Sequence, residues 1–195
     1  MTIKSYNKLP EFSFIMPAYN SEKYIAESIR ELQRESKIKW ELIIIDDFSE
    51  DKTLEIVKNF RKKDKRVKVY KNLKKGKVNG LNYGFKKSKG KIIKFVDSDD
   101  ILSREYFKLF DKLKKYQAHC HNAFITDNKL KIISRYNVNP LIISKSYKDV
   151  LTRLISCPKA FWSCDRKIAK KIFPLPISLP FEDVWINLII KKNSK

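Results

Sequence analysis

Acidic side chains gather at two points of this sequence, each directly after a run of apolar residues. Asp46 and Asp47 follow residues 42–45, and the segment 97–100, Asp-Ser-Asp-Asp, follows residues 92–96. Carboxylates can exchange protons with a substrate, and they are ligands that Mg²⁺ and Mn²⁺ prefer. The alternative is that each aspartate only caps the helix that follows it. Because the chain has 22 acidic residues against 43 basic ones, two such clusters favour a functional role.

Asp97 and Asp99 are the strongest candidates for a metal site. In an extended segment, residues i and i+2 point to the same side, so these two carboxylates are expected to lie together while Ser98 faces away. A divalent cation of this kind typically binds one or two carboxylates and completes its shell with phosphate oxygens of a substrate. The spacing therefore predicts Mg²⁺ or Mn²⁺ beside a phosphorylated ligand.

Alternating strands and helices are expected to carry both clusters. Ser21 is a candidate N-cap of the first helix. The alternation indicates right-handed βαβ crossovers in an α/β sheet, whose ligands bind beyond the carboxyl ends of the strands. Both acidic clusters follow strands and so fall at that edge. The pattern predicts strands at 12–16, 41–45, 67–70 and 91–96, and helices at 21–35, from 51 and at 77–87.

The second half of the sequence is harder to divide. No linker rich in glycine, serine or proline interrupts the first 115 residues. We therefore divide one domain into residues 1–115, which carry the acidic clusters, and residues 116–195, which supply further loops. In the second half and just before it we expect a helix at 105–116, a hairpin of 123–126 and 130–134, and helices at 147–155, 165–172 and 181–192.

Composition limits the classes of function. The chain of 195 residues is 43% hydrophobic, with a formal net charge of +21, so it can bury a core despite its charge. It lacks an apolar run long enough for a membrane-spanning helix, and residues 1–11 lack the apolar core of a secretory signal. Three widely spaced cysteines favour reduced thiols in the cytoplasm. The positive charge is compatible with nucleic acid, an anionic membrane or phosphorylated substrates as binding partners. The cations are spread along all segments, however, and this distribution disfavours nucleic acid.

Four motifs follow one another in the first half. They are Pro-Ala-Tyr-Asn at 17–20, Asp-Asp-Phe-Ser-Glu-Asp-Lys-Thr at 46–53, a glycine- and asparagine-containing helix at 76–84, and a strand at 89–100 that ends in Asp-x-Asp. Together they resemble the motifs of family-2 glycosyltransferases, the inverting enzymes of the GT-A fold. The resemblance implies a Rossmann-like, mostly parallel α/β sheet flanked by helices, with a smaller acceptor-side region in residues 116–195.

The resemblance also implies roles for individual residues. Asp99 would be the principal metal ligand, and Asp97 would reach both the ribose and the metal. Asp100 either supports the site or caps the next helix. A carboxylate beside the base can accept the imide N–H of uracil. Lys77 lies near the base or diphosphate unless it is one of the many solvated cations. The residues implied to hold the sugar nucleotide are Pro17, Tyr19, Asn20, Asp46, Asp47, Lys77, Asp97 and Ser98.

A catalytic base is implied in the second half. Inverting transfer is a direct displacement at the anomeric carbon, which needs a carboxylate to take the acceptor proton and a cation to stabilise the departing diphosphate. Family members carry a Glu-Asp pair at a helix start, and Glu182 and Asp183, after Pro180, match it. We assign the base to Asp183, with Glu182 as its neighbour. Alternatively, the two carboxylates only stabilise the start of the helix through its dipole. The chain ends soon afterwards, so we expect a truncated carboxyl-terminal side.

The resemblance thus implies a metal-dependent inverting glycosyltransferase that uses Mn²⁺ or Mg²⁺. It would move a sugar from a nucleotide-diphosphate donor, with a UDP-sugar favoured, to a hydroxyl of a glycan or lipid-linked acceptor in cell-surface polysaccharide synthesis. We expect a cytoplasmic location, with the positive charge attracted to the anionic inner face of the plasma membrane or to a phosphorylated glycan. The alternatives are a nucleotide-sugar-binding protein without catalysis and a nucleic-acid-binding protein. The segment 119–121, His-Cys-His, fits no standard zinc spacing.

Overall fold

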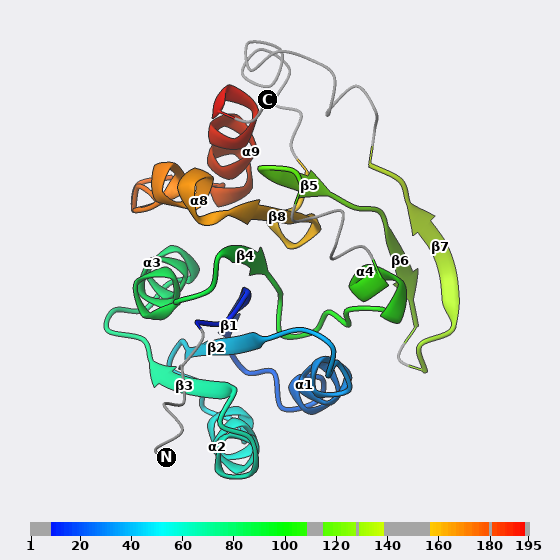
Figure 1. Ribbon diagram of the computed structural model, residues 1–195. Helices are drawn as coiled ribbons and strands as arrows, with labels where there is room; N and C mark the ends of the chain where they lie inside the picture. The colour runs from blue at the N-terminus through cyan, green and yellow to red at the C-terminus, as the bar shows by residue number, and fades with distance from the viewer. Residues whose placement is uncertain (1–8, 109–114, 128, 139–156, 180, 194–195) are drawn as a thin grey trace, which may run out of the picture.

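Six strands form one central sheet in the order β3-β2-β1-β4-β8-β5 (Figure 1). The computed structural model describes residues 9–108, 115–127, 129–138, 157–179 and 181–193. Strands β1 to β4 pair in parallel, whereas β8 runs antiparallel to both β4 and β5. The expected mostly parallel α/β sheet is therefore confirmed. The strands are β1 (Phe12–Ala18), β2 (Trp40–Asp46), β3 (Val67–Lys71), β4 (Ile92–Phe95), β5 (Ala118–Cys120) and β8 (Trp162–Asp165).

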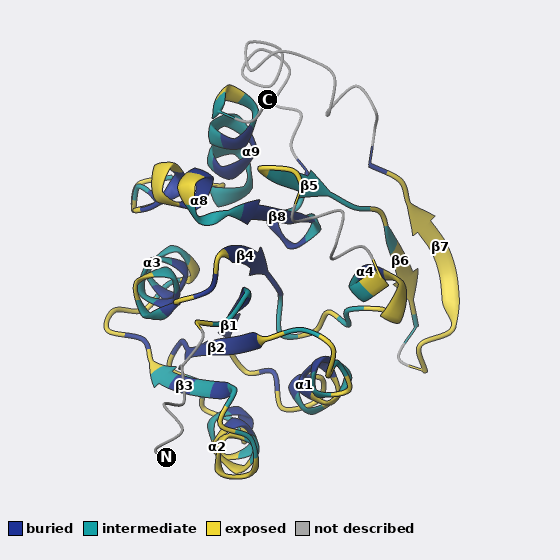
Figure 2. Ribbon diagram, in the orientation of Figure 1, coloured by how far each residue is buried: buried dark blue, intermediate teal, exposed yellow. Residues whose placement is uncertain are grey.

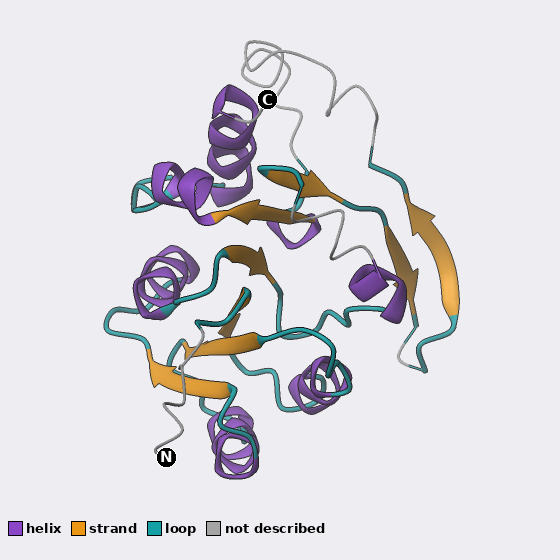
Figure 3. Cartoon of the chain, in the orientation of Figure 1, coloured by secondary structure: helices purple, strands orange, loops and turns teal. Residues whose placement is uncertain are grey.

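Helices cover both faces of this sheet (Figure 3). Helices α1, α2 and α4 bury one apolar cluster against it, and α3, α8 and α9 bury a second cluster on the opposite face. A short 3-10 helix, η1, leads directly into β8. The helices are α1 (Ile25–Gln33), α2 (Thr53–Lys63), α3 (Lys77–Lys87), α4 (Arg104–Lys108), η1 (Lys159–Phe161), α8 (Arg166–Ile172) and α9 (Glu182–Asn193).

Strands β1, β2 and β4 are buried along their whole length, whereas β3 at the sheet edge is only partly buried. Burial on both faces is typical of parallel strands that helices cover on each side. In β1, Phe14 and Met16 pack in the cluster of α1 and α2, and Ile15 packs in the cluster of α3. Helix α3 lies very close to the sheet at Gly84, where a Cβ atom would come within 2.6 Å of Cγ2 of Ile15. This close packing fixes the first turn of α3 beside the carboxyl ends of β1 and β2.

A separate two-stranded sheet stands off from the central one. It consists of β6 (Ala123–Thr126) and β7 (Ile132–Tyr136), and it is largely exposed (Figure 2). The expected hairpin is therefore present, with its second strand beginning at Ile132 instead of residue 130. None of the helices in the described part of the chain has the length and apolar character needed to span a lipid bilayer.

Helix α1 begins later than the sequence predicts, and the side chain of Ser21 does not cap it. The carbonyl of Ser21 accepts hydrogen bonds from the N–H groups of Tyr24 and Ile25, so a turn precedes the helix. The hydroxyl of Ser21 donates instead to the carbonyl of Tyr19 and lies 2.7 Å from Oγ of Ser98. The assignment of Ser21 as N-cap was wrong because this hydroxyl connects the loops after β1 and β4.

The expected helices of the second half are present where the structure describes them. Of the helix expected at 105–116, the structure shows α4, while residues 109–114 lie outside the described residues, as does the helix expected at 147–155. Helix α8 matches the helix expected at 165–172, and its N-cap Asp165 accepts a hydrogen bond from the N–H of Ile168 at 2.7 Å. Helix α9 begins at Glu182, so the carboxylate pair stands in its first turn.

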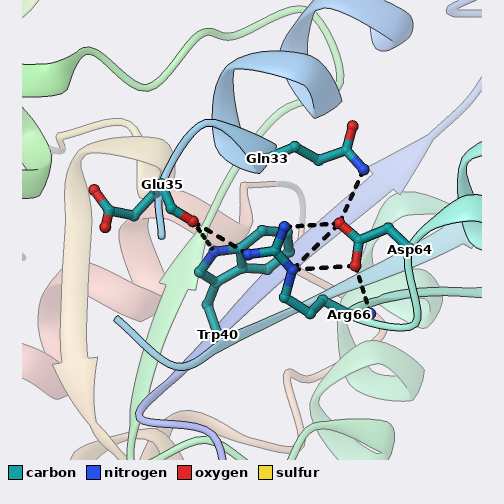
Figure 4. Close-up of polar contacts among 5 residues, drawn as sticks. All are labelled: Gln33, Glu35, Trp40, Asp64 and Arg66. Atoms are coloured by element: carbon teal, nitrogen blue, oxygen red, sulfur yellow. Dashed lines mark hydrogen bonds and ion pairs between the residues drawn. The ribbon is translucent and has the colours of Figure 1, made fainter. Parts of the chain in front are cut away.

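A polar cluster around Arg66 ties the amino ends of β2 and β3 together (Figure 4). The guanidinium of Arg66 donates to Asp64 at 2.8 Å and lies 3.9 Å from the centre of the Trp40 ring. Gln33 also donates to Asp64, and the carbonyl of Glu35 accepts from Trp40 and Arg66. The cluster therefore joins α1, β2 and β3 at the end opposite the acidic residues and leaves the carboxyl edge free for ligands.

Candidate active site

The two aspartates after β2 have different surroundings. The carboxylate of Asp47 accepts hydrogen bonds from the N–H of Gly76 at 2.9 and 3.0 Å and from Nδ2 of Asn72 at 2.7 Å. Asp47 thereby fixes the loop that leads into α3, where Gly76 has a φ of 121° that favours glycine. Asp46 is only 2% exposed, and its Oδ1 has no hydrogen-bond partner among the described residues. Asp46 thus carries a buried acceptor without a partner at the carboxyl edge of the sheet.

The residues of the first motif divide into structural and accessible ones. Pro17 is buried in β1 and faces Gly80 of α3. Asn20 has a left-handed backbone, with φ of 45°, and its Oδ1 accepts the N–H of Glu50, so it connects the loops after β1 and β2. Tyr19 is 47% exposed, and Nζ of Lys75 lies 5.1 Å from its ring centre. Of these three motif residues, Pro17 is buried, whereas Tyr19 and Asn20 are exposed.

Strand β4 is followed by a turn, not by the extended segment expected. The N–H of Asp100 donates to the carbonyl of Asp97 at 3.1 Å, which closes the turn. The alternation argument was therefore wrong for this segment: Asp97 is half-buried, Asp99 is exposed, and Ser98 points to Ser21. Burial raises the pKa of Asp100, and the neighbouring Asp97 and Asp99 raise it further.

Two lysines and two carboxylates meet beside this turn. Nζ of Lys159 donates to Oδ1 of Asp97 at 2.6 Å and lies 3.9 Å from Oε1 of Glu182. Nζ of Lys77 lies 3.6 Å from the same Asp97 oxygen and 3.4 Å from the same Glu182 oxygen. The Lys159 side chain is 2% exposed and that of Lys77 is 50% exposed. The cluster thus pairs one buried and one accessible cation with carboxylates from distant parts of the chain.

The charges of this cluster shift one another's protonation. Burial opposes ionisation of Asp97, but Lys159 and then Lys77 lower the pKa of its carboxyl group below the usual range. Burial likewise opposes the charge of Lys77, yet Asp97 and Glu182 raise its pKa. Asp97 is therefore an anion and Lys77 a cation at neutral pH.

Asp183 lies next to this cluster in the first turn of α9. Burial raises the pKa of its carboxyl group, although the N–H of Lys159 donates to Oδ1 at 2.8 Å and favours the anion. One turn later, buried Asn187 donates to the carbonyl of Asp183 at 2.6 Å and to that of Cys157 at 2.7 Å. Its Oδ1 accepts the N–H of Cys157 and the indole N–H of Trp162. Asn187 therefore fastens the start of α9 to the segment that contains η1.

Sequence reasoning missed Lys159 and Asn187. A lysine is most often solvated, and the chain has 43 basic residues, so no single one stands out by type. One signal was available: Lys159 is the only charged residue in the run Cys-Pro-Lys-Ala-Phe-Trp at 157–162. A lone lysine within an apolar run indicates a buried, paired ammonium.

Strand β4 carries a second buried lysine, Lys94. Nζ of Lys94 lies 2.9 Å from Nε2 of His121 and donates to the carbonyl of Ala160. Burial lowers the pKa of Lys94 to about 7 and that of His121 to about 3. Cys120 points elsewhere, with Sγ 3.2 Å from Sγ of Cys157. The segment 119–121 is therefore half-buried, with Cys120 packed against the core. The described residues contain no group of three or more His, Cys, Asp or Glu side chains suited to a metal.

The turn after β4 nevertheless fits a divalent cation held together with a substrate. Asp99 is exposed, and both lysine contacts to Asp97 are made through Oδ1, which leaves Oδ2 for a cation. One or two carboxylates with phosphate oxygens are a usual shell for Mg²⁺.

A cavity of about 570 Å³ adjoins the same turn. It lies between the turn, which contributes Asp99 and Asp100, and the β6–β7 hairpin, which contributes Phe124 and Ile132. Phe161 of η1 forms part of its wall. The cavity thus places an aromatic and apolar surface beside Asp99, one of the candidate metal ligands.

A mostly parallel sheet with Asp46, Asp47 and the Asp-x-Asp turn at its carboxyl edge defines a protein of the GT-A class. The family model of glycosyl transferase family 2 matches residues 13–173. The chain therefore belongs to glycosyltransferase family 2, as its four motifs predict.

Known proteins resemble this chain over part of their length. An uncharacterized glycosyltransferase of Haemophilus influenzae is 41% identical over 139 residues, which cover 65% of this chain and 53% of that protein. The poly(ribitol-phosphate) beta-N-acetylglucosaminyltransferase TarS of Staphylococcus aureus is 38% identical over 101 residues, which cover 50% of this chain and 18% of TarS. A crystal structure of TarS 1-349 in complex with UDP-GlcNAc matches with a TM-score of 0.73 at 24% identity, over 95% of this chain and 54% of that one. This chain thus spans about half, or less, of the length of these relatives.

Proposed function

We propose that this chain is the donor-binding and transfer domain of an inverting glycosyltransferase. It moves a sugar from a UDP-sugar to a hydroxyl group of a cell-surface glycan or lipid-linked acceptor. The observation that carries the proposal is the convergence of Asp97, Lys77 and Asp183 from three elements at the carboxyl edge of the sheet. An Asp-x-Asp turn, a cation for the diphosphate and a half-buried carboxylate are the three parts that such a displacement needs.

On the donor side, the uracil lies at the end of β2. Its imide N–H satisfies the unpaired Oδ1 of Asp46, and its ring has the exposed face of Tyr19 available for stacking. Lys77 is accessible and turns from Asp97 toward the diphosphate while Glu182 remains its partner. Lysine binds phosphate as a point charge, so Lys77 can replace a carboxylate oxygen by a phosphate oxygen without a fixed geometry. Asp47, Asn20 and Pro17 act by shaping the loops around the nucleotide.

The transfer step is a single displacement. The acceptor hydroxyl oxygen attacks the anomeric carbon, the bond from that carbon to the diphosphate oxygen breaks, and the hydroxyl proton passes to Asp183. The electron pair leaves with UDP, and the configuration at the anomeric carbon inverts. Burial raises the pKa of Asp183, which makes its carboxylate a better proton acceptor near neutral pH. Glu182 holds Lys77 near the diphosphate.

Asp99, together with Oδ2 of Asp97, would hold Mn²⁺ or Mg²⁺. The cation would supply positive charge to the departing diphosphate. The acceptor enters from the cavity between the turn after β4 and the β6–β7 hairpin, where Phe124 and Phe161 can contact a sugar ring. TarS, whose name specifies poly(ribitol-phosphate), acts on an anionic polymer, and an acceptor of that charge would suit a chain of +21.

The same charge supports a peripheral position at the anionic inner face of the plasma membrane. The last turn of α2 alone carries Arg61, Lys62 and Lys63. Each basic residue near such a surface contributes about 1 kcal/mol. Binding to vesicles that contain anionic lipid should therefore be strong at low salt and weak at high salt. Equal binding to neutral vesicles would contradict this location.

Calorimetric titration with UDP tests the donor site. UDP should bind, Mn²⁺ should strengthen the binding, and Asp99→Ala should remove the effect of Mn²⁺. Binding that is absent, or indifferent to both, would refute the glycosyltransferase proposal and favour a nucleic-acid or other anionic partner.

Turnover then tests the transfer step. Release of UDP from UDP-GlcNAc and other UDP-sugars should be lost in Asp183→Asn while UDP affinity is kept. Asp165→Asn, which retains the cap of α8 far from the site, is the matched control. Unchanged turnover in Asp183→Asn would assign the base to another residue. UDP binding without any turnover in the parent would select a nucleotide-sugar-binding protein.

A further inference from the structure

Lys159 touches both halves of the candidate site with different parts of one residue. Its side chain reaches Asp97, 62 positions earlier in the sequence, at 2.6 Å. Its backbone N–H reaches Oδ1 of Asp183, 24 positions later, at 2.8 Å. Because Nζ is paired and buried, the side chain of Lys159 is held in one conformation between these two contacts. The position of Asp97 relative to Asp183 is therefore set through a single residue.

The backbone around Lys159 is itself held in place. Asn187 accepts the N–H of Cys157 at 3.2 Å and donates to its carbonyl at 2.7 Å. The carbonyl of Pro158 accepts the N–H of Phe161 at 2.9 Å, which closes the turn of η1. Lys159 is thus presented from a segment that is fastened to α9 on one side and continues into β8 on the other.

We propose that Lys159 is a positioning residue for the transfer reaction, which holds the Asp-x-Asp aspartate and the catalytic base at a fixed separation. The inference rests on the proposed function above. Lys159 does not contact the reacting atoms, because its Nζ is buried behind Asp97. Lys159 acts through Asp97, whose carboxylate it orients. It also acts through Asp183, whose carboxylate accepts the backbone N–H of Lys159 and is stabilised as an anion by the ammonium charge.

The charge of Lys159 offers a way to separate this role from a merely structural one. The groups that act on Asp183 are Lys159 and Lys77, which favour its anion, and Glu182, which disfavours it. The contact with Cys120 and burial raise the pKa of the nearby Cys157 thiol, and the charge of Asp183 adds to that rise. A Lys159→Met variant keeps the backbone N–H and the apolar stem but loses the charge. The pKa of Asp183 should then rise further, so the base becomes protonated at a higher pH.

The experiment compares Lys159→Met and Lys159→Arg with the parent by steady-state turnover of the UDP-sugar between pH 5 and pH 9. In Lys159→Met, kcat should fall by about tenfold or more. The acidic limb of its pH profile should move up by about one pH unit. In Lys159→Arg, which keeps the charge, the limb should stay at the parent's position. Lys170→Met, an exposed lysine of α8, is the matched control and should behave as the parent.

Two outcomes would overturn the inference. One is a Lys159→Met variant with the kcat and pH profile of the control. The other is a loss of kcat with an unmoved acidic limb, or with a limb displaced equally in Lys159→Arg, either of which would indicate only a structural role. Asp97 stays partly solvated and keeps Lys77 in Lys159→Met, so we expect this variant to fold, and a circular dichroism melt checks that. Absence of UDP binding in the parent would instead refute the proposed function itself.

Discussion

Replacing Asp97 by alanine should destabilise the folded protein, whereas replacing Asp99 two residues later should not. Asp97 pairs at 2.6 Å with Lys159, whose side chain is 2% exposed. Without Asp97, the ammonium of Lys159 stays buried with Glu182 at 3.9 Å as its remaining carboxylate. Asp99 is exposed, so its loss leaves no charge behind in the interior.

The magnitude follows from the burial of the pair. Breaking a fully buried ion pair by removing one partner costs about 3 to 5 kcal/mol. Asp97 is 30% exposed, and Glu182 offsets part of the lost attraction, so we expect about 2 kcal/mol for Asp97→Ala. In a domain of this size, that loss lowers the melting temperature by roughly 4 to 8 °C. For Asp99→Ala, the change should stay within about 0.5 kcal/mol.

Urea denaturation of both variants measures the difference. A double variant, Asp97→Ala with Lys159→Met, provides the internal control, because it removes the buried ammonium together with its partner. The double variant should be more stable than Asp97→Ala alone. If Asp97→Ala unfolds at the same urea concentration as Asp99→Ala, the buried pair does not exist in solution and the reasoning fails. Stability should therefore be measured before any loss of activity in Asp97→Ala is attributed to metal binding.

Three further predictions concern other parts of the structure. Gly90→Ala should cost about 2 kcal/mol or more in urea denaturation, since its Cβ would lie 2.4 Å from the backbone nitrogen of Ser13; an unchanged midpoint would contradict that packing. Lys94 titrates near 7 when folded and near 10.5 when unfolded, so the unfolded chain binds more protons between these values and stability should rise with pH across them. Lys94→Met should flatten that rise, and an equal slope would refute it. Diamide should oxidise Cys120 and Cys157, with sulfurs 3.2 Å apart, to one disulfide detectable by mass spectrometry of peptides, and Cys157→Ser should prevent it.

The sequence predicts the first half of the fold well because the apolar segments of the sequence are also the buried segments of the folded protein there. The buried strands β1, β2 and β4 consist mostly of apolar residues, and α3 has the bounds that its sequence pattern predicts. The acidic residues fall at the carboxyl edge because chain direction alone places strand ends there. The four motifs then identify the family without any knowledge of contacts.

The parts that sequence could not predict depend on pairings between distant residues. The antiparallel insertion of β8 between β4 and β5 follows from the packing of both halves, not from any local pattern. The turn after β4 replaces an extended segment because Asp100 bonds back to Asp97. The burial of Lys159 requires Asp97 from one half and Asn187 from the other. A lysine is usually solvated, and Lys159 is buried because its partners come together only in the folded protein.

The place of β8 in the sheet also governs when the sheet can be completed during synthesis. Strand β4 leaves the ribosome well before β8, and its second neighbour in the finished sheet is β8. At about 5 to 20 residues per second, the edge of β4 waits roughly 3 to 15 s with unpaired backbone groups. Among the strands that the structure describes, β5 also pairs with β8 alone. A nascent chain that stops short of residue 162 should therefore be a chaperone client, and the arrival of a single four-residue strand releases it.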